Sequence, residues 1–176
     1  MNSVTKTLVA LALLGTFGPS VAFAAPKSVT GSAALALAAV LAPHSPLLRA
    51  EEKRAVASLF DGNTRIGSAA KKKLSVIADS VVCRISDVDI TARSCNLTFK
   101  AGKKTDKRSL SGRAANEVYA TMAMAGVVSE GAAGSLIQTV TRLNCTLDPG
   151  VIKQKGGGGA KCSFRTDAQR LFDALS

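Results

Sequence analysis

Few side chains in this sequence of 176 residues are of the types that perform catalysis. A nucleophilic serine or cysteine needs a neighbouring base, usually histidine, and the single histidine, His44, lies in a proline-flanked segment without a catalytic motif. Asp87, Asp89 and Asp148 are candidates for the paired carboxylates of a hydrolase, but acidic residues are also common in turns. A small hydrolase with a carboxylate site is therefore the least favoured hypothesis, and we expect no enzyme.

The four cysteines, Cys83, Cys95, Cys145 and Cys162, are an even number and include no C-x-x-C pair. With one histidine in the chain, disulfides are favoured over a zinc site. Three pairings are possible, and we expect Cys83–Cys95 and Cys145–Cys162. Each of these pairs flanks a turn-rich segment between two strand-like runs, and a hairpin brings such positions within disulfide distance.

The glycine run at residues 156–159 is followed by Ala160 and Lys161, which gives it some likeness to a phosphate-binding loop. That loop needs Gly-Lys-Ser/Thr before a helix, whereas here Cys162 follows the lysine and a strand is expected next. The run therefore predicts a mobile hairpin tip, and no cofactor and no metal are expected.

Basic residues carry the strongest functional signal, because the formal net charge is +11. They gather around residues 71–73, 100–113 and 153–165, in segments that we predict to be loops or strand ends. A convergent cluster of cations raises the local potential and attracts polyanions. The expected ligand-binding residues are Lys100, Lys103, Lys104, Lys107, Arg108, Lys153, Lys155 and Lys161.

The expected function is that of an exported, non-enzymatic binding protein that presents these basic loops. Its expected partner is an anionic envelope polymer, lipid head groups or an acidic protein. Nucleic acid is disfavoured, because the chain has one tyrosine, no tryptophan and no recognition-helix motif.

Residues 1–24 have the pattern of a secretory signal peptide. Lys6 precedes a short apolar run, and Ala22-Phe23-Ala24 is a suitable cleavage site. The run is too short to span a bilayer, so we expect cleavage after Ala24 and a periplasmic or secreted protein without a transmembrane span.

Residues 33–42 are apolar on all sides of a predicted helix. We expect this helix to be packed in the core. The alternative is that it docks on a partner, which would make the protein a structural or assembly factor.

The periodicity of the chain predicts an α+β fold, in which a small antiparallel sheet of two disulfide-stapled hairpins packs on a central helix, preceded by two N-terminal helices. The predicted domains are an N-terminal helical segment, residues 25–63, and an α+β domain, residues 64–176. Helices are predicted at residues 31–42, 46–60 (with Ser45 as N-cap), 112–125 and 166–176. Strands are predicted at residues 74–85, 88–90, 95–99, 136–147, 151–152 and 162–165, with a basic loop at 100–109 and a turn at 148–150.

Overall fold

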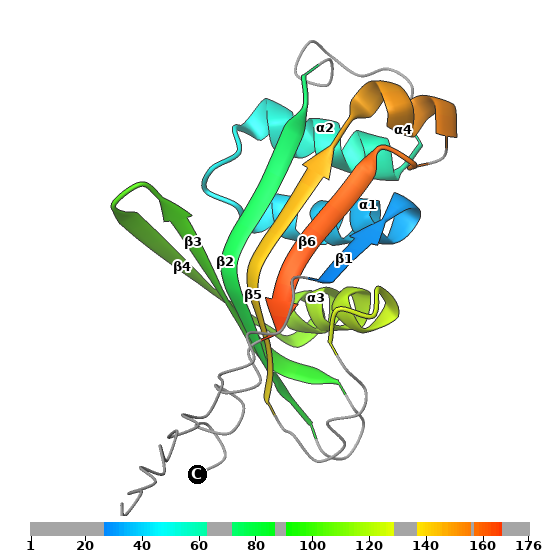
Figure 1. Ribbon diagram of the computed structural model, residues 1–176. Coiled ribbons are helices and arrows are strands. Elements are labelled where there is room, and N and C mark those ends of the chain that lie inside the picture. Colours follow the sequence, from blue (N-terminus) through cyan, green and yellow to red (C-terminus); the bar gives the residue numbers. More distant parts are fainter. Residues whose placement is uncertain (1–26, 63–71, 87–90, 129–136, 156, 167–176) are drawn as a thin grey trace, which may run out of the picture.

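The structure is a computed structural model, and it describes residues 27–62, 72–86, 91–128, 137–155 and 157–166 (Figure 1). The predicted signal peptide, the strand at 88–90 and the tail after Thr166 lie outside these residues. So does the expected domain boundary at residue 63, and all of these stay predictions.

The strands form one antiparallel sheet in the order β1-β6-β5-β2-β3-β4 (Figure 1). The α+β class is therefore confirmed. The sheet is larger than two hairpins, because an extra strand lies at each edge, before the first predicted helix and in the predicted basic loop. The strands are β1 (Lys27–Thr30), β2 (Leu74–Ile85), β3 (Ala92–Ala101), β4 (Lys104–Ser111), β5 (Ile137–Leu147) and β6 (Ala160–Thr166).

Both predicted disulfides are present. Cys83 of β2 lies directly opposite Cys95 of β3, and Cys145 of β5 lies opposite Cys162 of β6. The Cα atoms are 4.0 Å and 3.9 Å apart, respectively. Each disulfide therefore ties two neighbouring strands of the same sheet together.

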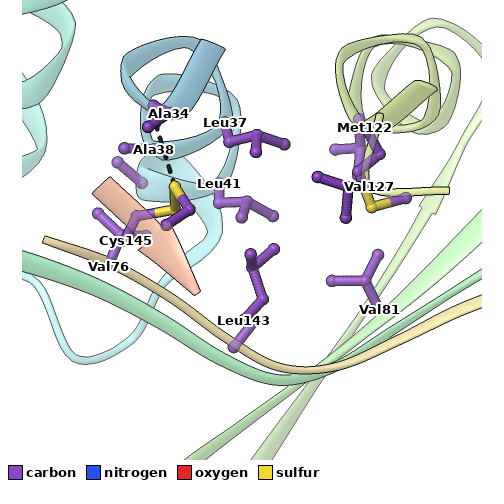
Figure 2. Packing of buried hydrophobic residues seen from close by; sticks show 14 of the residues in the cluster. Ala34, Leu37, Ala38, Leu41, Val76, Val81, Met122, Val127, Leu143 and Cys145 are labelled. Carbon is purple, nitrogen blue, oxygen red and sulfur yellow. Dashed lines mark hydrogen bonds between the residues drawn. A yellow bond between two sulfur atoms is a disulfide. The ribbon is translucent and has the colours of Figure 1, made fainter. Parts of the chain in front are cut away.

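The helices are α1 (Gly31–Leu41), α2 (Ala50–Phe60), α3 (Gly112–Met124) and α4 (Pro149–Lys155), with a short 3-10 turn, η1 (Ala42–His44), after α1. Helices α1 and α3 pack against the same face of the sheet, and α2 packs against α1 (Figure 1). Figure 2 shows Leu143 and Val81 of the sheet directed toward these helices, where both are fully buried. The small side chain of Ala34 lets α1 approach closely, so that Cys162 Sγ lies 3.3 Å from its carbonyl oxygen.

Helix α1 is a core element. Its residues Ala34, Leu35, Leu37, Ala38 and Leu41 are buried, and none of its apolar side chains is exposed. The expectation of a packed helix is confirmed, while the alternative that this helix docks on a partner stays a prediction.

The predicted helix start at residue 46, with Ser45 as N-cap, was wrong. Ser45 Oγ does accept a hydrogen bond from the backbone N–H of Leu47, at 3.3 Å, but the chain makes a turn there and α2 begins only at Ala50. The backbone N–H of Arg49 donates to Glu52 Oε2 at 2.8 Å, and this bond satisfies a donor at the helix start.

The short strand predicted at residues 151–152 was also wrong, because both residues belong to α4. Asp148 caps this helix: its Oδ1 accepts hydrogen bonds from the backbone N–H groups of Gly150 and Val151, at 3.2 and 3.4 Å. A carboxylate at this position accepts hydrogen bonds from backbone N–H groups of the first helical turn, which have no partner within the helix.

Two described glycines of the run, Gly157 and Gly159, are packed against neighbouring elements and do not form a free hairpin tip. Gly157 is buried, and a Cβ there would lie 3.2 Å from the backbone of Gly31 and Ser32. At Gly159, a Cβ would lie 2.7 Å from that of Val151. These glycines therefore let the start of β6 pass close to α1 and α4.

None of the described helices has the length and apolar character needed to cross a membrane. The two disulfides indicate a non-cytoplasmic environment, because reducing compartments keep thiols reduced.

Candidate functional site

The two faces of the sheet differ in character. Residues directly opposite each other on neighbouring strands share a face. Both disulfides and the apolar core lie on the face covered by α1 and α3, which we call the helix face. The other side, which we call the open face, carries serine, threonine, asparagine and basic side chains on the described strands.

One cross-strand row shows how the open face is organised. Lys107 of β4 pairs with Thr98, Thr98 with Ser80, Ser80 with Thr141, and Thr141 with Arg165 of β6. The row crosses five strands, or about 19 Å at about 4.8 Å per strand spacing. A cation thus stands at each end of a row of hydroxyl groups.

Further basic residues share this face. By register, Arg84 lies beside Ser94, Lys100 lies two residues from Thr98 along β3, and Lys161 lies beside Thr146. Asp79 is the acidic residue among them, and it pairs with Lys100 Nζ at 2.9 Å. The open face of the described strands therefore has a strong excess of positive charge.

The eight basic residues predicted to bind a ligand are divided by the structure. Lys100, Lys107 and Lys161 all lie on the open face, on β3, β4 and β6. Lys103 lies in the two-residue turn between β3 and β4, where Gly102 has a φ of 61°. Lys104 and Arg108 lie on the helix face, opposite Ala101 and Leu97, and Lys153 and Lys155 belong to α4, with side chains outside the described set.

The predicted basic loop at residues 100–109 was wrong, because most of it is the edge strand β4. Lysines on an edge strand also discourage pairing with other chains. Arg108 is paired with Asp106 at 2.9 Å, whereas Lys103, Lys104 and Lys107 take no part in the ion pairs among the described residues.

A groove of about 380 Å³ indents the open face, and residues of β2, β3, β5 and β6 line it. Sequence reasoning did not find it, since its members are far apart in the chain. Its lining residues are Ile77, Ala78, Asp79, Lys100, Arg142, Asn144, Ser163, Phe164 and Arg165.

The groove contains a strained residue. Arg142 has a φ of 51°, and it is the non-glycine residue with positive φ in the described chain. The pairing of β5 with β6 shifts by one residue between Thr141 and Asn144, so Arg142 sits in a bulge. Left-handed backbone costs a non-glycine residue roughly 1–2 kcal/mol, and bulges often redirect a side chain.

The groove also contains an unsatisfied polar atom. Asn144 Oδ1 is buried and has no hydrogen-bond partner among the described residues. A buried acceptor without a donor costs about 1–3 kcal/mol. Strain and an unpaired acceptor therefore occur two residues apart, in the same groove.

His44, the histidine considered for catalysis, lies half-buried in η1. Burial lowers its pKa below the usual 6.5, and the nearby charges of Lys53 and Arg108 lower that pKa further, with Glu117 acting in the opposite direction. These surroundings disfavour the charged imidazolium.

A stability prediction follows for His44. Because the folded-state pKa is lowered, the unfolded state takes up the proton first, and stability should fall as the pH drops below about 6.5. We expect His44→Gln to weaken this acid dependence, measured by urea unfolding between pH 7.5 and 5. If the stability of His44→Gln depends on pH as strongly as that of the unchanged protein, His44 is not the cause of the acid dependence.

Of the three carboxylates considered for a hydrolase site, the structure describes one, Asp148, and gives it a structural role. Asp148 caps α4, while Asp87 and Asp89 lie outside the described residues. Among the described residues, no group of three histidine, cysteine or acidic side chains is placed to hold a metal ion.

Comparison with known protein families, with curated proteins and with solved structures finds no match to this chain.

Proposed function

We propose that the protein is an exported, non-enzymatic binding protein whose open face holds an anionic polysaccharide of the cell envelope. The carrying observation is the row from Lys107 to Arg165, with hydroxyl side chains between two cations on the sheet face that none of the described helices covers. An extended polymer can meet charges about 19 Å apart at the same time, whereas a small anion cannot.

The character of the open face favours a polymer over a lipid surface. Membrane-bound surfaces insert large apolar side chains below the head groups. The exposed large apolar residues among those described are Phe60, Ile77 and Met124, and Ile77 alone belongs to the open face, where it lines the groove. The binding test must also distinguish a polysaccharide from an acidic protein as the partner.

The test is binding of the oxidised protein to immobilised heparin and polygalacturonate, with neutral dextran as control. If about four cations each neutralise one anionic group, affinity should fall roughly 100-fold between 50 and 200 mM salt, by analogy with counterion release from nucleic acids. No binding at 50 mM salt, or equal binding to dextran, would contradict the proposal. If the protein binds an acidic protein but neither polymer, an acidic protein is favoured as its partner.

A further inference from the structure

The groove on the open face has features that the charge of this face does not explain. It combines two guanidinium groups, the exposed side chain of Ile77 and an unpaired acceptor. We propose that it is a subsite for one carboxylate-bearing sugar unit, of the uronic acid class. The inference deepens the proposed function and rests on it, because it names the unit of the polymer that the open face recognises.

The cations of the groove favour a carboxylate. Lys100 is already paired with Asp79 at 2.9 Å, while Arg142 and Arg165 take no part in the ion pairs among the described residues. The planar guanidinium group matches a carboxylate with two parallel hydrogen bonds. The groove can therefore receive one carboxylate without breaking an ion pair.

The remaining walls favour a sugar over a simple carboxylate. Asn144 Oδ1 needs a donor, and a sugar hydroxyl supplies one; Ser163 adds a hydroxyl group of its own. Ile77 is exposed and lines the groove, so it can give the C–H face of a pyranose ring an apolar contact. A volume of about 380 Å³ lies at the small end of ligand pockets, which suits one sugar unit.

The backbone strain at Arg142 fits this role. Non-glycine residues with a strained backbone, such as Arg142, are found most often at binding sites, where the strain holds a side chain in one direction. Glycine at this position would relieve the strain and remove the guanidinium group. Stability and binding are therefore expected to change in opposite directions in Arg142→Gly, a result that a purely structural role for Arg142 does not predict.

The experiment is an NMR titration of the oxidised protein with glucuronate, glucose and acetate. We expect saturable binding for glucuronate alone among the three ligands, with a dissociation constant in the millimolar range. The amide chemical shifts of Ile77, Asn144 and Ser163 should change during this titration. Arg142→Gly should lower the affinity for glucuronate at least about tenfold, and it should raise the melting temperature of the protein by about 3 °C. Lys27→Ala removes one cation of the helix face, and it should leave glucuronate affinity unchanged.

Several results would overturn the inference. They are equal binding of acetate or glucose, shifts away from the groove, or full glucuronate affinity in Arg142→Gly. Should that variant misfold, Arg142→Asn replaces it, because asparagine tolerates positive φ. If polygalacturonate binds but glucuronate does not, the subsite is wrong and the proposed function stands; if neither binds, both are wrong.

Discussion

Exchange of Lys107 and Lys161 for glutamate in one protein is expected to weaken binding to polygalacturonate on the order of 100-fold at 50 mM salt. Both lysines lie on the open face, on β4 and β6, at opposite sides of the groove. Each exchange replaces an attraction with a repulsion, and about 1.4 kcal/mol per site gives this factor. Affinity is to be measured by isothermal titration calorimetry.

The matched control is Lys27→Glu with Lys104→Glu. It changes the net charge by the same amount, but both lysines lie on the helix face, opposite Phe164 and Ala101. The control should bind within a few-fold of the unchanged protein, because these lysines lie on the side of the sheet away from the bound polymer and salt screens the remaining interaction over a Debye length of about 14 Å at 50 mM. Equal losses in the two variants would show that net charge alone drives binding and would contradict the role of the open face.

Reduction of both disulfides is expected to remove most of the stability of the fold. The bridged cysteines are separated by 12 and 17 residues in the sequence. Loop-closure entropy then gives about 3 kcal/mol for each bridge, or about 6 kcal/mol together, against a typical total of 5–15 kcal/mol. The measurement is urea unfolding with and without dithiothreitol.

Two single-bridge variants extend this test. Cys83→Ala with Cys95→Ala, and Cys145→Ala with Cys162→Ala, should each lose about half of the effect, because the bridges join different strand pairs and face different helices. An unfolding midpoint that reduction leaves unchanged would show that the core holds the sheet without them.

The elements with strong hydrophobic patterns were predictable from the sequence. Strand β2 and helix α3 match the expected ranges closely, because each buries a regular apolar set such as Val76 and Val81 or Val118 and Met122. The disulfide pairing was predictable because residues that flank a hairpin lie opposite each other. Edge strand β4 was not predictable, since its residues are nearly all exposed and its order comes from backbone pairing with β3.

The candidate site was predictable only in part. Clusters in the sequence suggested Lys100, Lys107 and Lys161, but alternation along strands sends neighbouring residues to opposite faces, as it does for Lys107 and Arg108. Arg84 and Arg142 are isolated in the sequence; strand register places Arg84 on the open face, and Arg142 joins it through the bulge of β5 that lines the groove. The bulge at Arg142 has no glycine or proline to signal it.

The most direct test of the open face is protection of lysines from acetylation, read by mass spectrometry with and without saturating polygalacturonate. We expect the polymer to protect Lys100, Lys107 and Lys161 and to leave Lys27 and Lys104 labelled as in the free protein. Uniform protection, or protection restricted to the helix-face lysines, would contradict this expectation.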